Sequence, residues 1–157
     1  MIAIIDYDAG NIKSVEKALH YLGEETTVTR DPQTLLNADK VILPGVGSFG
    51  QAMENLHTYG LVPVIHEIVE KKTPFLGICL GLQLLFESSE ETPGVEGLGI
   101  LKGKLLRFLL RRGLRFHIWD GIPCIFRIMA DCFRESRNRP MYILCIPIIC
   151  RQRSLRL

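Results

Sequence analysis

The segment of residues 77–81 (GICLG) places one cysteine between two glycines, a pattern that can present a thiol as a nucleophile. The apolar run Pro74–Ile78 predicts a short buried strand, and Leu80–Glu87 has the apolar spacing of a helix. We therefore expect Cys79 on a tight strand-to-helix turn, with a strained backbone and a thiol pKa lowered by the helix start. A buried cysteine without a chemical role explains the bare pattern equally well.

A second glycine-rich segment, residues 44–50 (PGVGSFG), follows an apolar strand predicted at Lys40–Leu43. Its three glycines permit backbone amides to face a ligand. Beside a nucleophile such amides form an oxyanion hole, in which the residue after the nucleophile, here Leu80, is the other usual donor. Taken alone, the segment is equally compatible with a flexible connection, and its pairing with the Cys79 turn favours the oxyanion hole.

The N-terminal residues repeat the same arrangement of strand, polar turn and helix. A strand is predicted at Ile2–Ile5 and a helix at Ile12–Leu22, and residues 6–11 (DYDAGN) connect them. One helix face carries Ile12, Val15, Ala18, Leu19 and Leu22, while Lys13, Glu16 and Lys17 are expected in solvent. Asn11 is either a simple helix N-cap or a residue at the ligand-binding edge of the sheet.

Strands alternate with helices along the first 108 residues, which predicts an α/β fold with a mostly parallel sheet and helices on both faces. The predicted strands are Ile2–Asp6, Glu25–Thr29, Lys40–Leu43 and Phe75–Ile78, with further strand-like sequence at Leu101–Phe108. The carboxyl edge of this sheet would gather Asn11, the glycine-rich segment and Cys79.

Three segments, in this order and spacing, resemble the glutamine amidotransferase subunit of imidazole glycerol phosphate synthase, from histidine biosynthesis. They are residues 2–23 (IAIIDYDAGNIKSVEKALHYLG), 41–53 (VILPGVGSFGQAM) and 74–87 (PFLGICLGLQLLFE). The motif GICLGLQ alone indicates only the class I, triad-type amidotransferases, and DYDAGN with PGVGSFG narrows the resemblance to this subunit. It extends from Met1 to about Phe108.

This resemblance implies a glutaminase that hydrolyses L-glutamine to glutamate and ammonia. The ammonia would pass through a channel to a (β/α)₈ cyclase subunit in a heterodimer, which makes imidazole glycerol phosphate and AICAR. By the same resemblance Cys79 is the nucleophile, Gln83 binds glutamine and Asn11 lies at the subunit interface. The oxyanion donors would be Val46, Gly47 and Leu80. The implied fold is the flavodoxin-like class I amidotransferase domain, its C-terminal part missing or aberrant, with no cofactor and no metal ion.

Thioester chemistry also needs an imidazole that protonates the departing amine, and no histidine of this chain fits. In the family this base is a histidine followed two residues later by a glutamate, downstream of the cysteine. His20, His57 and His66 all precede Cys79, and we expect them in surface or packing positions. His117 comes late enough, but its neighbours match no catalytic context.

The chain changes composition after Phe108. Residues 1–108 carry 9 basic and 14 acidic side chains, whereas residues 109–157 carry 10 arginines, 3 acids and four of the five cysteines. This tail has three interpretations: a basic nucleic-acid arm, a metal-binding segment, or sequence never selected to fold. Its aromatic residues are sparse for nucleic-acid binding, and its cysteine spacings do not match paired CxxC zinc ligands.

The third interpretation is supported by the genetic code. Shifting the reading frame of residues 115–126 (RFHIWDGIPCIF) permits the translation VPHMGWNTLHF, and the same shift of residues 141–149 permits VYFVHSYY. Both strings resemble downstream segments of the family, in the right order. We infer a frameshift between about Phe108 and Arg115, which leaves a domain portion at residues 1–108, an aberrant tail at residues 109–157 and no catalytic histidine or glutamate.

Two other functions remain open for such a chain: a non-catalytic α/β module that binds a partner, and a related cysteine hydrolase. The short start before acidic Asp6 shows no signal-peptide pattern, and no apolar run approaches the length of a membrane span. A lone cysteine in residues 1–108 also favours a reducing compartment. We expect a cytoplasmic protein that binds neither nucleic acid nor membrane and whose tail, Leu109–Leu157, has no defined packed role.

The frameshift hypothesis makes a prediction about the gene. Resequencing codons 105 to 116 should reveal one inserted or missing nucleotide, and its correction should restore a frame that encodes the family's downstream segments. An unaltered reading frame across these codons would contradict the hypothesis.

Overall fold

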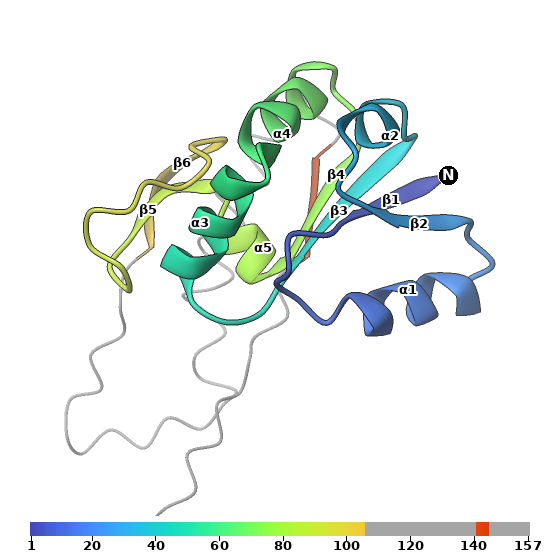
Figure 1. Cartoon of the computed structure of the whole chain (residues 1–157), viewed down its shortest axis with the longest axis horizontal. Coiled ribbons are helices and arrows are strands. Elements are labelled where there is room, and N and C mark those ends of the chain that lie inside the picture. Colours follow the sequence, from blue (N-terminus) through green and yellow to red (C-terminus); the bar gives the residue numbers. More distant parts are fainter. Residues whose placement is uncertain (106–140, 145–157) are drawn as a thin grey trace, which may run out of the picture.

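The computed structural model describes residues 1–105 and 141–144, and these form a parallel sheet with helices on both sides (Figure 1). The five-stranded sheet has the order β2-β1-β3-β4-β7. Its strands are β1 (Ile2–Ile5), β2 (Thr26–Thr29), β3 (Lys40–Gly45), β4 (Phe75–Cys79) and β7 (Met141–Leu144). The helix α1 (Ile12–Tyr21) lies on one side of this sheet. The other side carries α2 (Pro32–Leu36), α3 (Phe49–Thr58), α4 (Leu61–Glu70) and the short α5 (Leu80–Gln83).

All neighbouring strands of the sheet run parallel, so their carboxyl ends meet at one edge. Ile2 of β1 pairs with Thr26 on one side and with Lys40 on the other. The pairing of β3 with β4 runs from Val41↔Phe75 to Gly45↔Cys79. The predicted α/β class and the four predicted strands of this sheet are thus confirmed, with ends displaced by one or two residues.

The main core lies between the sheet and the helices α2 to α4. Ala3, Ile5, Val41 and Leu43 of the sheet are all fully buried there. From α4, the apolar residues Leu61, Val64, Ile65 and Ile68 are buried on one face, at the spacing that places side chains on one side of a helix. This burial fixes which side of each strand faces the helices, and with it the register.

Helix α1 packs less deeply than its sequence predicts. The helix forms as expected, but none of its residues is buried, and Leu22, at its C-cap, is 72% exposed. Ile12, Val15 and Leu19 are half-buried. The apolar face of α1 is thus only partly covered, because the helix contacts mainly the edge strand β2.

The predicted helix over Leu80–Glu87 is wrong beyond its first turn. Helix α5 ends at Gln83, and Phe86–Ser89 forms β5, which pairs parallel with β6 (Leu101–Leu105) in a separate two-stranded sheet. The amides of Leu98 and Leu101 donate to the carbonyls of Leu84 and Leu85, both at 2.8 Å. These non-local hydrogen bonds replace helical ones, and Leu84, Leu85 and Phe86 are buried.

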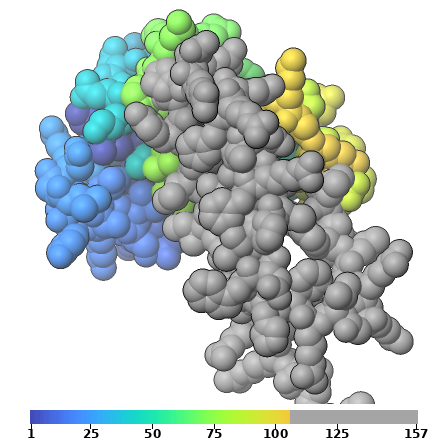
Figure 2. Space-filling model, turned by 180° about the vertical axis from the view of Figure 1, so that it is seen from behind, coloured from blue at the N-terminus to red at the C-terminus, as the bar shows by residue number. Residues whose placement is uncertain are grey.

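The two-stranded sheet lies away from the N-terminal part of the chain. In Figure 1 and in the view from behind in Figure 2, the N-terminal residues and the β5–β6 ribbon occupy opposite sides of the molecule. In the tail, Met141–Leu144 forms β7 beside β4, an exception to the expectation that this segment has no packed role. No helix in the described residues is long and apolar enough to cross a membrane.

Two glycines allow α5 to lie directly against the sheet. A Cβ atom on Gly77 would come within 2.7 Å of the Leu82 Cα, and one on Gly81 would overlap the carbonyl oxygen of Leu43. Both obstacles are backbone atoms, which cannot rotate aside. The helix start is therefore seated on β3 and β4 by backbone contact, and side chains at these two positions are excluded.

The Gly81 contact predicts a large loss of stability on substitution. Gly81→Ala should lower the free energy of unfolding by about 3 kcal/mol, because the methyl group forces β3 and α5 apart. Gly23→Ala is the control: Gly23 has open space around it and a φ of 79°. Its substitution should cost only about 1 kcal/mol of backbone strain. Urea denaturation measures both, and equal losses would contradict the packing described.

Candidate active site

Cys79 occupies the turn from β4 into α5, as predicted. It is the last residue of the strand and the N-cap of the helix, with φ 57° and ψ −114°. A positive φ is uncommon for a residue with a Cβ atom, and such strain is concentrated at functional sites. The side chain is half-buried.

The glycine-rich segment lies directly beside this turn, which confirms the predicted proximity. β3 ends at Gly45, and Gly45 is the register partner of Cys79. Residues 46–48 then connect β3 to α3, with Gly47 at φ 104° and the Val46 side chain 47% exposed. The Val46–Gly47 turn therefore begins directly after the register partner of Cys79, in a conformation at Gly47 that favours glycine.

The two turns approach each other closely enough to exclude a side chain between them. A Cβ atom on Gly45 would lie 2.6 Å from the amide nitrogen of Gly81 and 2.8 Å from the Leu80 Cβ. Leu80 is only 2% exposed. The spacing of the glycine-rich turn and the Cys79 turn is thus set by backbone contact.

The electrostatic environment does not activate the thiol, contrary to the sequence-based expectation. Burial raises the pKa of Cys79, and a hydrogen bond with the Leu80 backbone opposes this only in part. Helix α5 has four residues, too few for a substantial helix dipole at its start. The expected lowering of the thiol pKa by the helix is therefore wrong, because desolvation outweighs it.

Tyr7 is a site residue that the sequence interpretation missed. Its hydroxyl donates a 2.7 Å hydrogen bond to the carbonyl of Pro44, and its side chain is fully buried. A Cβ atom on Gly45 would come within 2.8 Å of the Tyr7 Oη. The alternation of Ala3, Ile5 and Tyr7 on one face of an extended chain was the signal that could have identified it.

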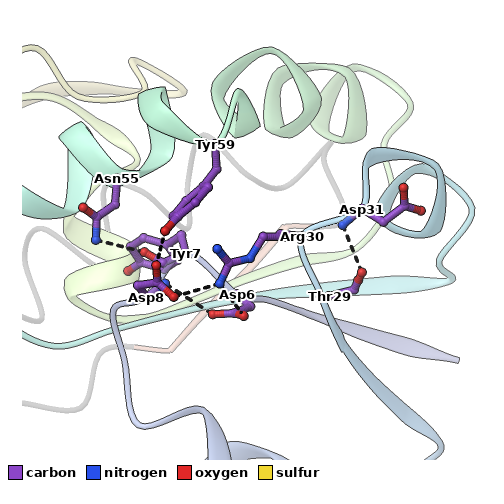
Figure 3. A network of polar contacts seen from close by, with 8 residues as sticks. All are labelled: Asp6, Tyr7, Asp8, Thr29, Arg30, Asp31, Asn55 and Tyr59. Atoms are coloured by element: carbon purple, nitrogen blue, oxygen red, sulfur yellow. Dashed lines mark hydrogen bonds and ion pairs between the residues drawn. The ribbon is translucent and has the colours of Figure 1, made fainter.

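A polar cluster holds the turn that contains Tyr7 (Figure 3). Arg30 Nη2 lies 2.7 Å from a carboxylate oxygen of both Asp6 and Asp8, and its guanidinium stacks 4.2 Å from the centre of the Tyr59 ring. The Tyr59 hydroxyl donates to Asp8, a residue with φ 59°. These donors lower the pKa of Asp8, Tyr59 having the larger effect and Arg30 the smaller. The cluster thus joins the ends of β1 and β2 to the C-terminal end of α3.

Asn11 and Gln83 lie at the same edge without making contacts that define a role. Asn11 occupies the N-cap position of α1, but its side chain makes no capping hydrogen bond, and its carbonyl accepts from the Ser14 amide at 3.1 Å. Gln83 is exposed at the end of α5. Both side chains therefore lie where a ligand or partner could reach them.

The described histidines are not placed to serve Cys79. His20 Nε2 lies 2.9 Å from the Thr26 hydroxyl, and His66 belongs to α4. His57, at the end of α3, lines an open groove of about 460 Å³ together with Ser48, Glu54 and Thr92. Within residues 1–105 and 141–144 no hydrogen bond joins a histidine to the Cys79 thiol, and His117 lies outside the described residues.

The site thus combines a thiol on a strained turn with a neighbouring glycine-rich turn and the Leu80 amide. A thiol and backbone amides in this arrangement suit attack on a carbonyl carbon and stabilisation of the resulting oxyanion. The imidazole that would complete acyl-transfer chemistry is not at the thiol among the described residues.

Residues 3–140 match the family model described as "Glutamine amidotransferase class-I". The chain therefore belongs to the class I glutamine amidotransferases. A solved structure titled "Crystal structure of glutamine amidotransferase" agrees in fold: its TM-score is 0.60 at 23% identity, over 72% of this chain and 60% of that one.

Within this class the chain groups with one subunit family. It is 48% identical, over 90% of its length, to "Imidazole glycerol phosphate synthase subunit HisH" of Methanocaldococcus jannaschii, and covers 70% of that protein. Its identity to the HisH subunit of Thermosynechococcus vestitus is 55%, over 72% of this chain and 54% of the relative. The chain is a member of the HisH family, the amidotransferase subunits of imidazole glycerol phosphate synthase.

The chain spans only part of the length of its relatives. It covers 55% of HisH 1 from Methanococcus maripaludis and 64% of HisH from a Bacillus cereus strain.

The raised pKa of Cys79 predicts its reactivity. Iodoacetamide alkylation of Cys79 should be slow at neutral pH and reach half its maximal rate above the ordinary thiol value of about 8.5, because only the thiolate reacts. Mass spectrometry of the Cys79 peptide separates this site from the tail cysteines. In urea the pH at which Cys79 alkylation reaches half its maximal rate should fall to the ordinary thiol pKa. A native midpoint below that value would contradict the dominance of burial.

The raised pKa of Cys79 also predicts the direction in which stability changes with pH. Between the unfolded and folded pKa values the unfolded state has released the thiol proton and the native state has kept it. The contribution of Cys79 to stability therefore falls as pH rises through the ordinary thiol value. Cys79→Ser should remove this component of the pH dependence.

Proposed function

We propose that the gene family to which this chain belongs supplies ammonia by hydrolysing L-glutamine, with Cys79 as the nucleophile. The observation that carries the proposal is the pairing of Gly45 with Cys79, which sets a glycine-rich turn against a thiol on a strained turn. In the proposed reaction the Cys79 sulfur attacks the carboxamide carbon of glutamine, ammonia leaves, and water hydrolyses the thioester to glutamate.

The other roles follow from position around this thiol. The amides of Val46, Gly47 and Leu80 would stabilise the oxyanion of the tetrahedral intermediates. Gln83, exposed at the end of α5, would contact glutamine. All of these groups lie at or beyond the carboxyl ends of β3 and β4, the edge at which parallel sheets bind ligands.

We further propose that the ammonia passes to a cyclase subunit in a heterodimeric cytoplasmic enzyme, which forms imidazole glycerol phosphate and AICAR. The printed names of the relatives, which describe one subunit of a synthase, support the existence of a partner. Asn11, exposed at the same edge of the sheet, would lie at the interface.

For this particular chain we propose that glutaminase activity is negligible. The supporting observation is that no described histidine is hydrogen-bonded to the thiol. A frameshift after about Phe108 would remove the catalytic histidine and glutamate together. The same observation favours a second candidate function, a non-catalytic module that retains partner binding.

Comparison of the 157-residue chain with a frame-restored version tests these proposals. Ammonia release from glutamine, measured with the cyclase subunit present, should be at least about 10⁴-fold slower for the 157-residue chain, because a triad base is missing. Cys79→Ser should abolish the activity of the restored version. Robust activity of the 157-residue chain would overturn the assignment of a missing base.

The two candidate functions differ in a second measurement. Co-purification of the 157-residue chain with the cyclase subunit, without ammonia release, would support the partner-binding module. A restored version that binds the cyclase but releases no ammonia would overturn the glutaminase proposal itself.

A further inference from the structure

We propose that Tyr7 is a positioning residue that holds the glycine-rich turn, residues 45–47, against Cys79 through its hydrogen bond to Pro44. This inference deepens the proposed function and rests on it for the meaning of the site. The arrangement that Tyr7 maintains is nevertheless a property of the fold that can be measured without a substrate.

The Tyr7 hydroxyl makes a buried hydrogen bond to the backbone of Pro44. Its oxygen lies 2.7 Å from the Pro44 carbonyl oxygen, with the ring fully buried in the core. In the buried interior, loss of the donor would leave the carbonyl without a partner, which is costly. The Pro44–Gly45 peptide is therefore held in one orientation.

The orientation of the Pro44–Gly45 peptide also restricts the glycine-rich turn that follows it. A trans peptide is planar, so fixing the Pro44 carbonyl also directs the Gly45 N–H to the opposite side. The Tyr7 oxygen occupies space next to the Gly45 Cα, within 2.8 Å of the position of a Cβ atom, on the same Cα that approaches the Gly81 amide. Tyr7 and the α5 start thus enclose Gly45, and glycine is the residue most free to rotate without such support.

The segment that contains Tyr7 is itself held by contacts from α3 and from Arg30, which follows β2. Its carbonyl accepts a 3.0 Å hydrogen bond from Asn55 Nδ2 of α3, and the residues on either side of it, Asp6 and Asp8, are both paired with Arg30. The Tyr59 hydroxyl holds Asp8 from the other direction (Figure 3). The hydroxyl of Tyr7 is therefore directed by a rigid turn.

Tyr7 is not available as a general base near neutral pH. Burial, and to a smaller extent the neighbouring Cys79, raises the pKa of the Tyr7 hydroxyl, so the group stays protonated. Its proton is directed to the Pro44 carbonyl. The contribution of Tyr7 to the site is therefore geometric.

The test is Tyr7→Phe in the 157-residue chain, which keeps the ring and removes the hydrogen bond. Amide hydrogen exchange at Gly45 and Val46, followed by ¹H–¹⁵N NMR, should accelerate about tenfold, the usual scale for one lost buried hydrogen bond. Exchange in α4, remote from the hydroxyl, should stay within twofold. The matched control is Tyr21→Phe, since Tyr21 is 91% exposed and its hydroxyl should not affect the turn.

Uniform acceleration throughout the chain, or exchange at Gly45 and Val46 equal to that of the control, would overturn the proposal. If Tyr7→Phe does not fold, the proposal is tested by a measurement on the wild-type chain. A slowly exchanging Tyr7 hydroxyl proton with a nuclear Overhauser effect to the Gly45 α-protons is expected, and its absence overturns the proposal.

The proposed function is decided separately by ammonia release from the frame-restored version, and the glutamine analogue 6-diazo-5-oxo-norleucine probes whether the 157-residue chain binds a glutamine-like group at Cys79. If the analogue labels Cys79 of the wild type, Tyr7→Phe should reduce its labelling rate about tenfold while iodoacetamide alkylation stays within twofold, since iodoacetamide needs only the thiolate. If the analogue does not label the wild type, the result agrees with the negligible glutaminase activity proposed for this chain, and amide exchange alone decides the role of Tyr7.

Discussion

The close approach of the β3 and β4 ends is the constraint on which the site depends. Gly45 meets the amide of Gly81, and Gly81 in turn meets the carbonyl of Leu43. With backbone against backbone, α5 begins on top of the sheet, and Cys79 must turn through a positive φ to enter it. The strained thiol and its glycine-rich neighbour are therefore two consequences of one packing arrangement, held by the buried core beneath them.

Buried and exposed polar contacts contribute differently to this arrangement. The bonds of Arg30 to Asp6 and Asp8 are partly exposed, so their Coulombic energy is screened by solvent and contributes little to stability individually. Their main effect is on backbone conformation, because together with Tyr59 they restrict a turn that includes Asp8, a residue with a strained positive φ. The Tyr7 to Pro44 bond is buried, and there the energetic consequence of an unpaired carbonyl is larger.

Burial also determines what the Cys79 thiol needs in order to react. Desolvation keeps the Cys79 thiol protonated near neutral pH, since α5 is too short to compensate. A cysteine in this environment needs a neighbouring imidazole to become a thiolate, and the described part of the chain places none there. The described contacts between the two turns come from residues within 1–105, so the geometry of the turns can form without the base, whereas the reactivity cannot. This difference would allow the family fold to coexist with the inactive site that we propose for this chain.

The sequence alone determined the alternation of strands and helices, the cysteine turn and its glycine-rich neighbour, because these depend on local apolar periodicity and on glycines flanking Cys79. It also indicated the family, since several motifs occur in one order. Tertiary structure decided what depends on contacts distant in sequence. Residues 84–89 are not helical because residues 97–101 form non-local hydrogen bonds with this segment. Burial raises the pKa of Cys79, whereas the sequence predicted that the helix would lower it. Tyr7 became part of the site only when Pro44, 37 residues later, was folded against its hydroxyl.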